Sequence, residues 1–284
     1  MKKHFKKLLL MALMAVMAVG LIACGTDKSD NESTKEEKTS VTITSLDASK
    51  NEIELEVPYN PKRIAILDLA SLDIIDELGV GDRVVGMAST SIDYLEKYSN
   101  DASIKNLGTI KEADLEAVME CEPDIIFIGG RLSKSYDALS EIAPVVYLAT
   151  DTNEGLVNSV SKNAKTIASI FGMEDKVDSL MSDFGARIDA IKKISSGKTA
   201  LVGMTTSGSF NLLGNDGRCS LIGVEAGFNN LTAAGSTSTH GNESSFETVV
   251  QQNPDYIFVM DRDSAISTAG AKTAKEIVEN ELVK

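Results

Sequence analysis

The chain has 284 residues, of which 43% are hydrophobic, so it can bury one large core or two modest ones. Its formal net charge is −14, from 28 Lys plus Arg against 42 Asp plus Glu. A surface of this sign repels nucleic acids and anionic lipids, which excludes both as partners of the folded part. The three cysteines show no CxxC spacing and predict neither a disulfide framework nor a zinc site.

The first residues have the pattern of an export signal. MKKHFKK supplies positive charge, and LLLMALMAVMAVGLIA is an apolar run too short for a comfortable membrane span. The run ends in LIACG, which resembles the lipobox of bacterial lipoproteins, where cleavage before the cysteine is coupled to lipid attachment. We therefore expect residues 1–23 to be a lipoprotein signal peptide and Cys24 to carry the lipid. An ordinary secretory signal with an incidental cysteine is the alternative.

A tether is predicted next, over residues 24–40. GTDKSDNESTKEEKTS has no aromatic residue, few apolar ones and many charges, so burial cannot offset the entropy lost on ordering it. This composition predicts a lipidated flexible tether.

Residues 41–152 have the pattern of an α/β lobe. VTITSLD and NEIELEV predict an opening hairpin, and PKRIAILD a buried strand. The strand-like runs RIAILD, RVVGMA, DIIFIGG and VVYLAT then alternate with the helical SLDIIDELGV, LEAVMECE and SYDALSEI. This alternation is typical of parallel βαβ units.

Residues 153–196 show no strand signal and include a long helix predicted over 174–194. Apolar residues recur there every three or four positions, which predicts one stripe facing a core: Val177, Leu180, Met181, Phe184, Ile188, Ile191 and Ile194. A helix of this length can join two lobes as a rigid linker. One more surface helix of a single domain is the alternative.

A second α/β lobe is predicted over residues 197–284, from KTALVGMTT and SFNLLG through the helical SLIGVEAG and FETVVQQN to YIFVMD. The predicted fold class is therefore α/β, with two α/β lobes joined by a long rigid linker helix and a ligand cleft between the lobes.

One phrase occurs in both lobes. LEAVMECEPDIIFIGGR begins at Leu115 and FETVVQQNPDYIFVMDR at Phe246, and the two align without a gap. Each copy predicts a helix, a Pro-Asp turn and a buried strand, and each closes on an arginine, Arg131 or Arg262. Because ligands collect beyond the carboxyl ends of parallel strands, we expect these arginines to converge on one ligand. A single such arginine would more often be a solvated loop charge.

Two further candidates lie between the copies. The glycine-rich turn GNDGR ends at Arg218, and its glycines allow close approach of a ligand but also simply make turns. STSTHGNESSFETV holds His240, the only histidine beyond the signal segment. Such a histidine is usually only a surface residue, but here it precedes the repeated helix at the end of the lobe predicted to face the cleft.

The lipobox, the two lobes, the linker helix and the repeat resemble the helical-backbone class of ABC-transporter solute-binding proteins. More narrowly, SYDALSEIAPVVYL, GNDGR, STHG and NPDYIFVMDR are similar to ferric catecholate-siderophore-binding lipoproteins, including those for petrobactin-like ligands. The resemblance implies that Arg131, Arg218 and Arg262 bind catecholate oxygens. It also implies that His240 can ligate the iron, but only when a tetradentate siderophore leaves two coordination positions of the iron open.

The same resemblance implies a docking role for two acidic residues. Glu116 and Glu247 begin the repeated helices, and glutamates on the lobe tips of the broader family dock onto arginine pockets of the permease. Favourable interaction with the helix dipole is the alternative reason for a glutamate there. The chain ends at ENELVK, where the family usually continues with a strand, a tyrosine-bearing loop and a helix. We therefore expect a second lobe truncated at its C-terminus, with direct iron ligation by His240 alone.

The expected function is capture of a ferric catecholate siderophore and its delivery to an ABC permease for iron uptake. The ligand is the ferric complex itself, and no cofactor is expected. We expect a monomer, anchored through Cys24 to the extracytoplasmic face of the cell membrane. The alternative is a binding lipoprotein for haem, cobalamin or a hydroxamate siderophore. An enzyme is not expected, because no GxSxG, HExxH, P-loop or GxGxxG motif is present.

Overall fold

The computed structural model describes residues 38–151, 154–232, 238–266 and 268–279. The predicted signal peptide, Cys24 and most of the predicted tether lie outside these residues. The described chain opens with the antiparallel pair β1 (Ser40–Leu46) and β2 (Glu52–Pro58), which confirms the predicted hairpin. No helix of the described residues is both long enough and apolar enough to span a bilayer.

The first lobe is built on a five-stranded parallel sheet with the order β5-β4-β3-β8-β9. Its strands are β3 (Ile64–Ile66), β4 (Val84–Met87), β5 (Lys105–Asn106), β8 (Ile125–Ile128) and β9 (Val145–Tyr147). The connections contain α2 (Leu69–Leu78), α3 (Glu96–Ser99), α4 (Leu115–Glu120), α5 (Tyr136–Ser140), the 3-10 segments η1 (Gly81–Arg83), η2 (Asp93–Leu95) and η3 (Gly130–Ser135), and the short pair β6 (Gly108–Thr109) and β7 (Glu112–Ala113).

Both faces of this sheet are buried. Successive residues of the central strands alternate between two hydrophobic clusters, with Ile64 and Ile66 in one and Ala65 and Leu67 in the other. A strand covered on both faces needs an uninterrupted apolar run, which is why RIAILD and DIIFIGG could be recognised in the sequence.

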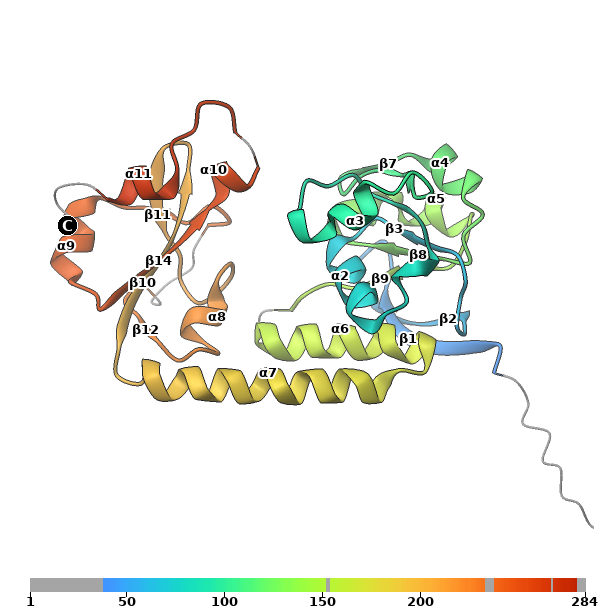
Figure 1. Cartoon of the computed structure of the whole chain (residues 1–284), viewed down its shortest axis with the longest axis horizontal. Helices are drawn as coiled ribbons and strands as arrows, with labels where there is room; N and C mark the ends of the chain where they lie inside the picture. The colour runs from blue at the N-terminus through green and yellow to red at the C-terminus, as the bar shows by residue number, and fades with distance from the viewer. Residues whose placement is uncertain (1–37, 152–153, 233–237, 267, 280–284) are drawn as a thin grey trace, which may run out of the picture. The chain divides into compact units, whose positions relative to one another are not determined.

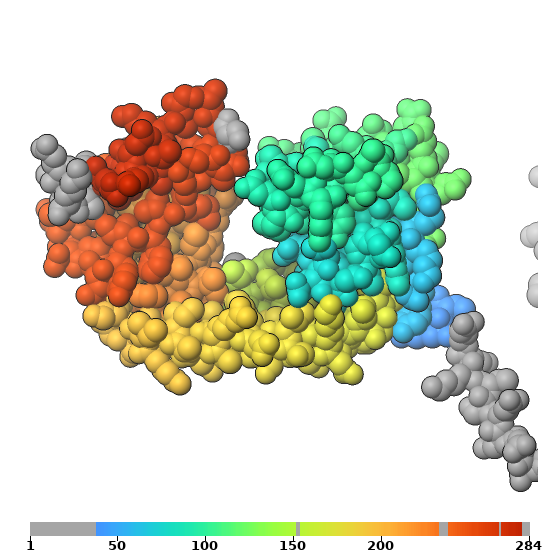
Figure 2. All heavy atoms as spheres, in the orientation of Figure 1, coloured from blue at the N-terminus to red at the C-terminus, as the bar shows by residue number. Residues whose placement is uncertain are grey.

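Two long helices follow, α6 (Leu156–Phe171) and α7 (Glu174–Ser195), and they lie side by side (Figure 1). Most residues of α7 are exposed, and Figure 2 shows its side chains (yellow) at the surface along the helix. The predicted apolar stripe is therefore only partly a core stripe. Val177 and Ile188 are buried, whereas Phe184, Ile191 and Ile194 are 38%, 40% and 72% exposed.

The exposure of Ile191 and Ile194 follows from the unequal length of the two helices, whereas Phe184 lines a cavity. α6 has 16 residues and α7 has 22, and a two-residue turn reverses the chain between them. The C-terminal part of α7 therefore extends beyond the start of α6, where no residue of α6 can cover it.

The second lobe has a mixed five-stranded sheet around β10 (Thr199–Thr206). β14 (Tyr256–Asp261) and β12 (Asn229–Asn230) pair with β10 in parallel, β11 (Ser209–Leu212) pairs with it antiparallel, and β13 (Asn242–Glu243) pairs with β11. The helices are α8 (Ser220–Gly223), α9 (Phe246–Gln252), α10 (Arg262–Ala265) and α11 (Ala274–Val278). α8 is shorter than SLIGVEAG predicted. The α/β class with two α/β lobes is confirmed.

The repeated phrase folds in the same way in both lobes. Asp114 caps α4 by accepting from the Ala117 amide, and Ser245 caps α9 by accepting from the Thr248 amide. At the other end of each helix one residue adopts a positive φ, 44° at Glu122 and 42° at Asn253. This left-handed residue turns the chain into the Pro-Asp step of each copy.

The aspartate of each Pro-Asp step ties two neighbouring strands together. Asp124 Oδ2 accepts from the backbone N–H groups of Lys62 and Arg63, at 2.7 and 2.9 Å, directly before β3. Asp255 Oδ2 accepts from the Thr199 N–H at 2.8 Å, at the start of β10. The repeat is thus a structural unit that fixes the start of one strand against its parallel neighbour, so that both strands end at the same edge.

Candidate functional site

A polar pocket of about 410 Å³ lies at the carboxyl end of β14. Two of the predicted site residues, Arg262 and His240, line it together. The pocket also contains hydroxyl, amide and carboxylate side chains that were not predicted as site residues: Thr206, Ser207, Ser209, Asn211 and Glu243.

Strand register explains how these residues meet. β10 and β14 run in parallel with Thr205 opposite Asp261, so the next residues, Thr206 and Arg262, emerge together at the sheet edge. Arg262 Nη1 donates to Thr206 Oγ1 at 3.3 Å, and the arginine side chain is 29% exposed. The one sequence feature that could have pointed to Thr206 is the Ser-Gly turn that follows it. Such a turn marks the end of a strand, and here it reverses the chain at the sheet edge where Arg262 lies.

His240 is exposed, and its backbone carbonyl is held in place. Asn211 Nδ2 donates to the His240 carbonyl oxygen at 2.9 Å, which ties this segment to β11. The imidazole and the Arg262 guanidinium therefore line one pocket although they come from separate segments of the chain.

The first lobe has a smaller cavity in the corresponding place. About 220 Å³ is enclosed by residues at the carboxyl ends of β3, β8 and β9, among them Asp68, Gly129 and Leu148. The backbone approaches closely here, since a Cβ on Gly129 would lie 2.7 Å from Asp68 Oδ1. Arg131 follows in η3 and is exposed. Each lobe thus has a cavity at the carboxyl edge of its sheet. Arg262 lines the cavity of the second lobe, and Arg131 follows directly after Gly130, which lines the cavity of the first.

Arg218 lies in the turn before α8 and is exposed. Cys219, which follows it, is a free, half-buried cysteine with a φ of 61°. Burial raises the pKa of the Cys219 thiol, and the positive charge of Arg218 acts in the opposite direction. The pocket that Arg262 and His240 line includes neither Arg218 nor Arg131.

The predicted docking residues occupy matching places. Glu116 lies in the first turn of α4 and Glu247 in the first turn of α9, and both are exposed. The pKa of Glu247 is lowered by a hydrogen bond from its own backbone N–H and by another from the Ser245 side chain. Both carboxylates can therefore be reached by another protein.

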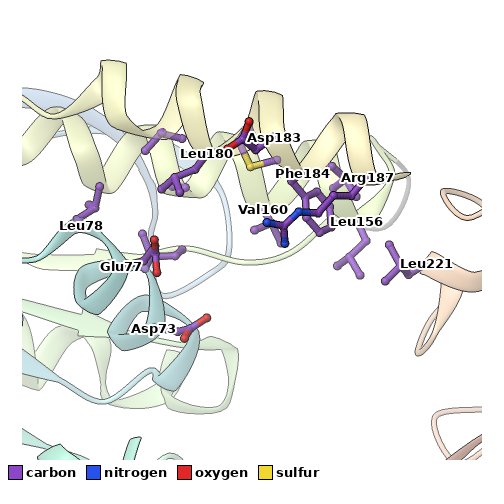
Figure 3. Close-up of a pocket in the computed structure, with 15 residues that line it drawn as sticks. Asp73, Glu77, Leu78, Leu156, Val160, Leu180, Asp183, Phe184, Arg187 and Leu221 are labelled. Carbon is purple, nitrogen blue, oxygen red and sulfur yellow. The ribbon is translucent and has the colours of Figure 1, made fainter. Parts of the chain in front are cut away.

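A larger cavity, of about 530 Å³, contains none of the predicted site residues (Figure 3). Its walls come from α2, α6, α7 and Leu221 of α8, and they are mainly apolar. Its charged residues are Asp73, Glu77 and Asp183 against Arg187 alone, as Figure 3 shows. An excess of carboxylates disfavours an anionic ligand, so this cavity does not fit the ligand that the arginines predict.

Among the residues that the structure describes, no group of three or more His, Cys, Asp and Glu side chains could hold a metal ion.

Comparison with known proteins agrees with this organisation. The sequence pattern of the periplasmic binding protein family matches residues 64–284, so the chain belongs to that family. The petrobactin-binding protein YclQ of Bacillus subtilis is 36% identical over 289 residues, covering 98% of this chain and 87% of YclQ.

Solved structures show the same relation. The crystal structure of YclQ aligns with a TM-score of 0.77 over 86% of this chain and 85% of that chain. The catecholate-siderophore binding protein VctP of Vibrio cholerae, 28% identical, aligns with a TM-score of 0.76 over 86% of each chain. PiuA of Streptococcus pneumoniae, an iron uptake ABC transporter substrate-binding protein, is 31% identical and has a TM-score of 0.76 over 86% of this chain and 85% of PiuA. These relatives are binding proteins, in agreement with the expectation that the chain is not an enzyme.

Proposed function

We propose that this chain captures a ferric siderophore of the catecholate class outside the cytoplasm and delivers it to an ABC permease. The observation that carries the proposal is the pocket at the carboxyl end of β14, where Arg262 and His240 meet. It occurs in a chain that is 36% identical to a petrobactin-binding protein.

The chemistry of the ligand suits the arginines. A ferric tris-catecholate is an Fe³⁺ ion surrounded by six anionic oxygens, so the complex is negative and has flat aromatic faces. Guanidinium groups stay charged, donate in a planar fork and tolerate desolvation better than an ammonium group. The protein as a whole repels an anion because its net charge is −14, so the attraction must be local. Hydrogen bonds to charged groups contribute roughly 1.5–3 kcal/mol each, so three arginines that each donate two such bonds can support micromolar to nanomolar binding after association costs.

In this proposal the ligand lies in a cleft between residues 41–152 and residues 197–284, which the helical region 153–196 connects. Arg131 reaches it from the first lobe, and Arg218 and Arg262 reach it from the second. His240 takes up an open coordination position of the iron when the siderophore is tetradentate, and its exposure leaves it accessible to the ligand.

A panel of ligands tests the substrate class. The chain has six tyrosines and no tryptophan, so quenching of tyrosine fluorescence, checked by calorimetry, can report binding. We expect ferric catecholates to bind at least about tenfold more tightly than ferric hydroxamates, haem or cobalamin, since a tenfold difference needs only about 1.4 kcal/mol. Preference for any of the other three would replace the catecholate assignment, and failure of every ferric chelate to bind would reject the function.

Docking onto the permease is assigned to Glu116 and Glu247. Replacing both by lysine should abolish iron uptake and leave ligand affinity unchanged, because both side chains are exposed and neither lines the pocket at β14. A matched control reverses Glu141, an exposed carboxylate of the first lobe. Loss of ligand affinity in the double variant would contradict the assignment.

The anchor is assigned to Cys24. Metabolic labelling with a radioactive fatty acid should label the wild-type chain, whereas the Cys24→Ser variant should stay unlabelled and keep its signal segment, because cleavage is coupled to lipid attachment. Labelling of that variant would contradict the assignment. We also propose that the protein acts as a monomer, and light scattering with and without the ferric chelate checks this.

A further inference from the structure

Asp263 lies directly beside the pocket arginine, Arg262. Asp263 is buried, with 2% of its surface exposed, and it does not line the pocket. Removing a carboxylate from water is costly unless a charged or hydrogen-bonding partner compensates. The partner here is Arg262, whose Nη1 lies 3.2 Å from Asp263 Oδ1.

The first copy of the repeat is followed by an apolar residue at the matching position. In the alignment of the two copies, Asp263 corresponds to Leu132, the residue after Arg131. Leu132 is also buried, with 1% of its surface exposed. The same place in the fold thus holds a leucine in the first lobe and an aspartate in the second. Since the first lobe buries an apolar residue at the matching position, burial alone does not explain the aspartate.

The contacts of the arginine supply that explanation. Arg262 Nη1 donates to Asp263 Oδ1 and to Thr206 Oγ1, at 3.2 and 3.3 Å. Both contacts use the same nitrogen of the guanidinium. Since a guanidinium has five N–H donors on three nitrogens, the donors of Nε and Nη2 are not engaged by these two bonds.

The backbone beside the pair is also fixed. Asp261 Oδ1 accepts from the Ser264 N–H at 3.1 Å, and Asp261 Oδ2 accepts from the Ala274 N–H at 2.7 Å. The pKa of Asp261 is lowered, chiefly by the bond from Ala274. The start of α10 is therefore held to α11, and the Asp263 carboxylate is held with it.

We propose that Asp263 is a positioning residue: it holds one end of the Arg262 guanidinium so that the remaining donors face the pocket and bind the anionic ligand. This rests on the proposed function, since it assigns a supporting residue to the same site. Holding the side chain before binding reduces the conformational entropy lost when the ligand arrives. No equivalent carboxylate follows Arg131, so the two lobes present their repeated arginines differently.

A double-mutant cycle tests the proposal. The probe is a synthetic hexadentate tris-catecholate of Fe³⁺, titrated into the purified chain by calorimetry. The variants are Asp263→Leu, which installs the first-lobe residue, Asp263→Asn, which keeps the shape and removes the charge, and each of these combined with Arg262→Ala. Asp189→Asn, an exposed position on α7, controls for the change in net charge.

We expect Asp263→Leu to raise Kd by about tenfold, Asp263→Asn to raise it less, and both to change Kd by less than about twofold once Arg262 is alanine. Wild-type affinity in both Asp263 variants, with Arg262→Ala impaired, would overturn the inference and leave the proposed function standing. An equal loss with and without Arg262 would also overturn it, because the aspartate would then act on the scaffold. Wild-type affinity in Arg262→Ala would overturn the assignment of Arg262 to the site, and the inference with it.

Discussion

Replacement of Ser45 by alanine tests whether the N-terminal hairpin is part of the first lobe. The hairpin precedes the region that the family pattern matches, which begins at residue 64. Ser45 lies on β1 and is 2% exposed. Its Oγ donates to the Tyr147 carbonyl oxygen at 3.3 Å and accepts from the Tyr147 N–H at 2.9 Å. Tyr147 is the last residue of β9, an edge strand of the sheet. The Ser45 hydroxyl therefore forms the two backbone hydrogen bonds that a neighbouring strand would otherwise form with Tyr147.

The expected magnitude follows from these two bonds. A buried backbone group left without a partner costs about 1–3 kcal/mol, and the longer bond to the carbonyl should contribute at the low end. Ser45→Ala should therefore reduce the free energy of unfolding by about 2 kcal/mol. In a chain of this size that corresponds to a fall in Tm of about 4–8 °C.

Urea unfolding followed by circular dichroism measures the change. The matched control is Ser40→Ala on the same strand, where the hydroxyl donates to the exposed Glu56 carboxylate. The control should stay within about 0.5 kcal/mol of wild type. A change of less than about 0.5 kcal/mol for Ser45→Ala would refute the reasoning, because the hairpin would then contribute little to the edge of the sheet.

Further predictions concern packing and pH. Gly203→Ala should destabilise the chain by about 1–3 kcal/mol, since its Cβ would lie 2.3 Å from Phe210 Cε2, whereas Gly185→Ala in α7, with no atom within 4 Å, should stabilise it by roughly 0.5–1 kcal/mol. Thermal unfolding distinguishes the two, and an equal effect of both would contradict the packing argument. The hydrogen bond from the Ala274 N–H lowers the pKa of the Asp261 carboxyl, so this carboxyl binds a proton more readily in the unfolded chain than in the folded chain. The ionised Asp261 therefore stabilises the fold above about pH 4, and this contribution is lost as the pH falls further. Asp261→Asn should flatten the dependence of stability on pH between about 5 and 3, and an unchanged slope would show that Asp261 does not contribute to it.

Most of the fold could be predicted because its elements are marked locally. Buried parallel strands need uninterrupted apolar runs, and each helix of the repeat has a polar cap and a turn residue that can be read in order. Buried polar groups could not be predicted. Ser45 and Asp263 occur in stretches that look like ordinary polar surface, and their partners are known only once the chain has folded. Burial on α7 was overestimated because periodicity shows which face is apolar and not how far the covering helix extends.

Two of the predicted site residues lie together in the pocket at β14, and their role in binding stays a prediction. The repeat led to Arg262 because register and the Pro-Asp step bring equivalent strands to one edge, and His240 lines the same pocket. Thr206 was missed because a threonine at the end of a strand has no distinctive pattern. Its role depends on which strand is the parallel neighbour of β10, and that is a property of the topology.

Titration of single variants is the sharpest test of whether Arg131, Arg218 and Arg262 together hold one ferric catecholate. Calorimetry with the synthetic tris-catecholate of Fe³⁺ should show a rise in Kd of about ten- to a hundredfold for each of Arg131→Ala, Arg218→Ala and Arg262→Ala, as expected for the loss of one charge-assisted contact. Arg187→Ala, in the separate apolar cavity, should bind like wild type. Wild-type affinity in all three arginine variants would contradict the account.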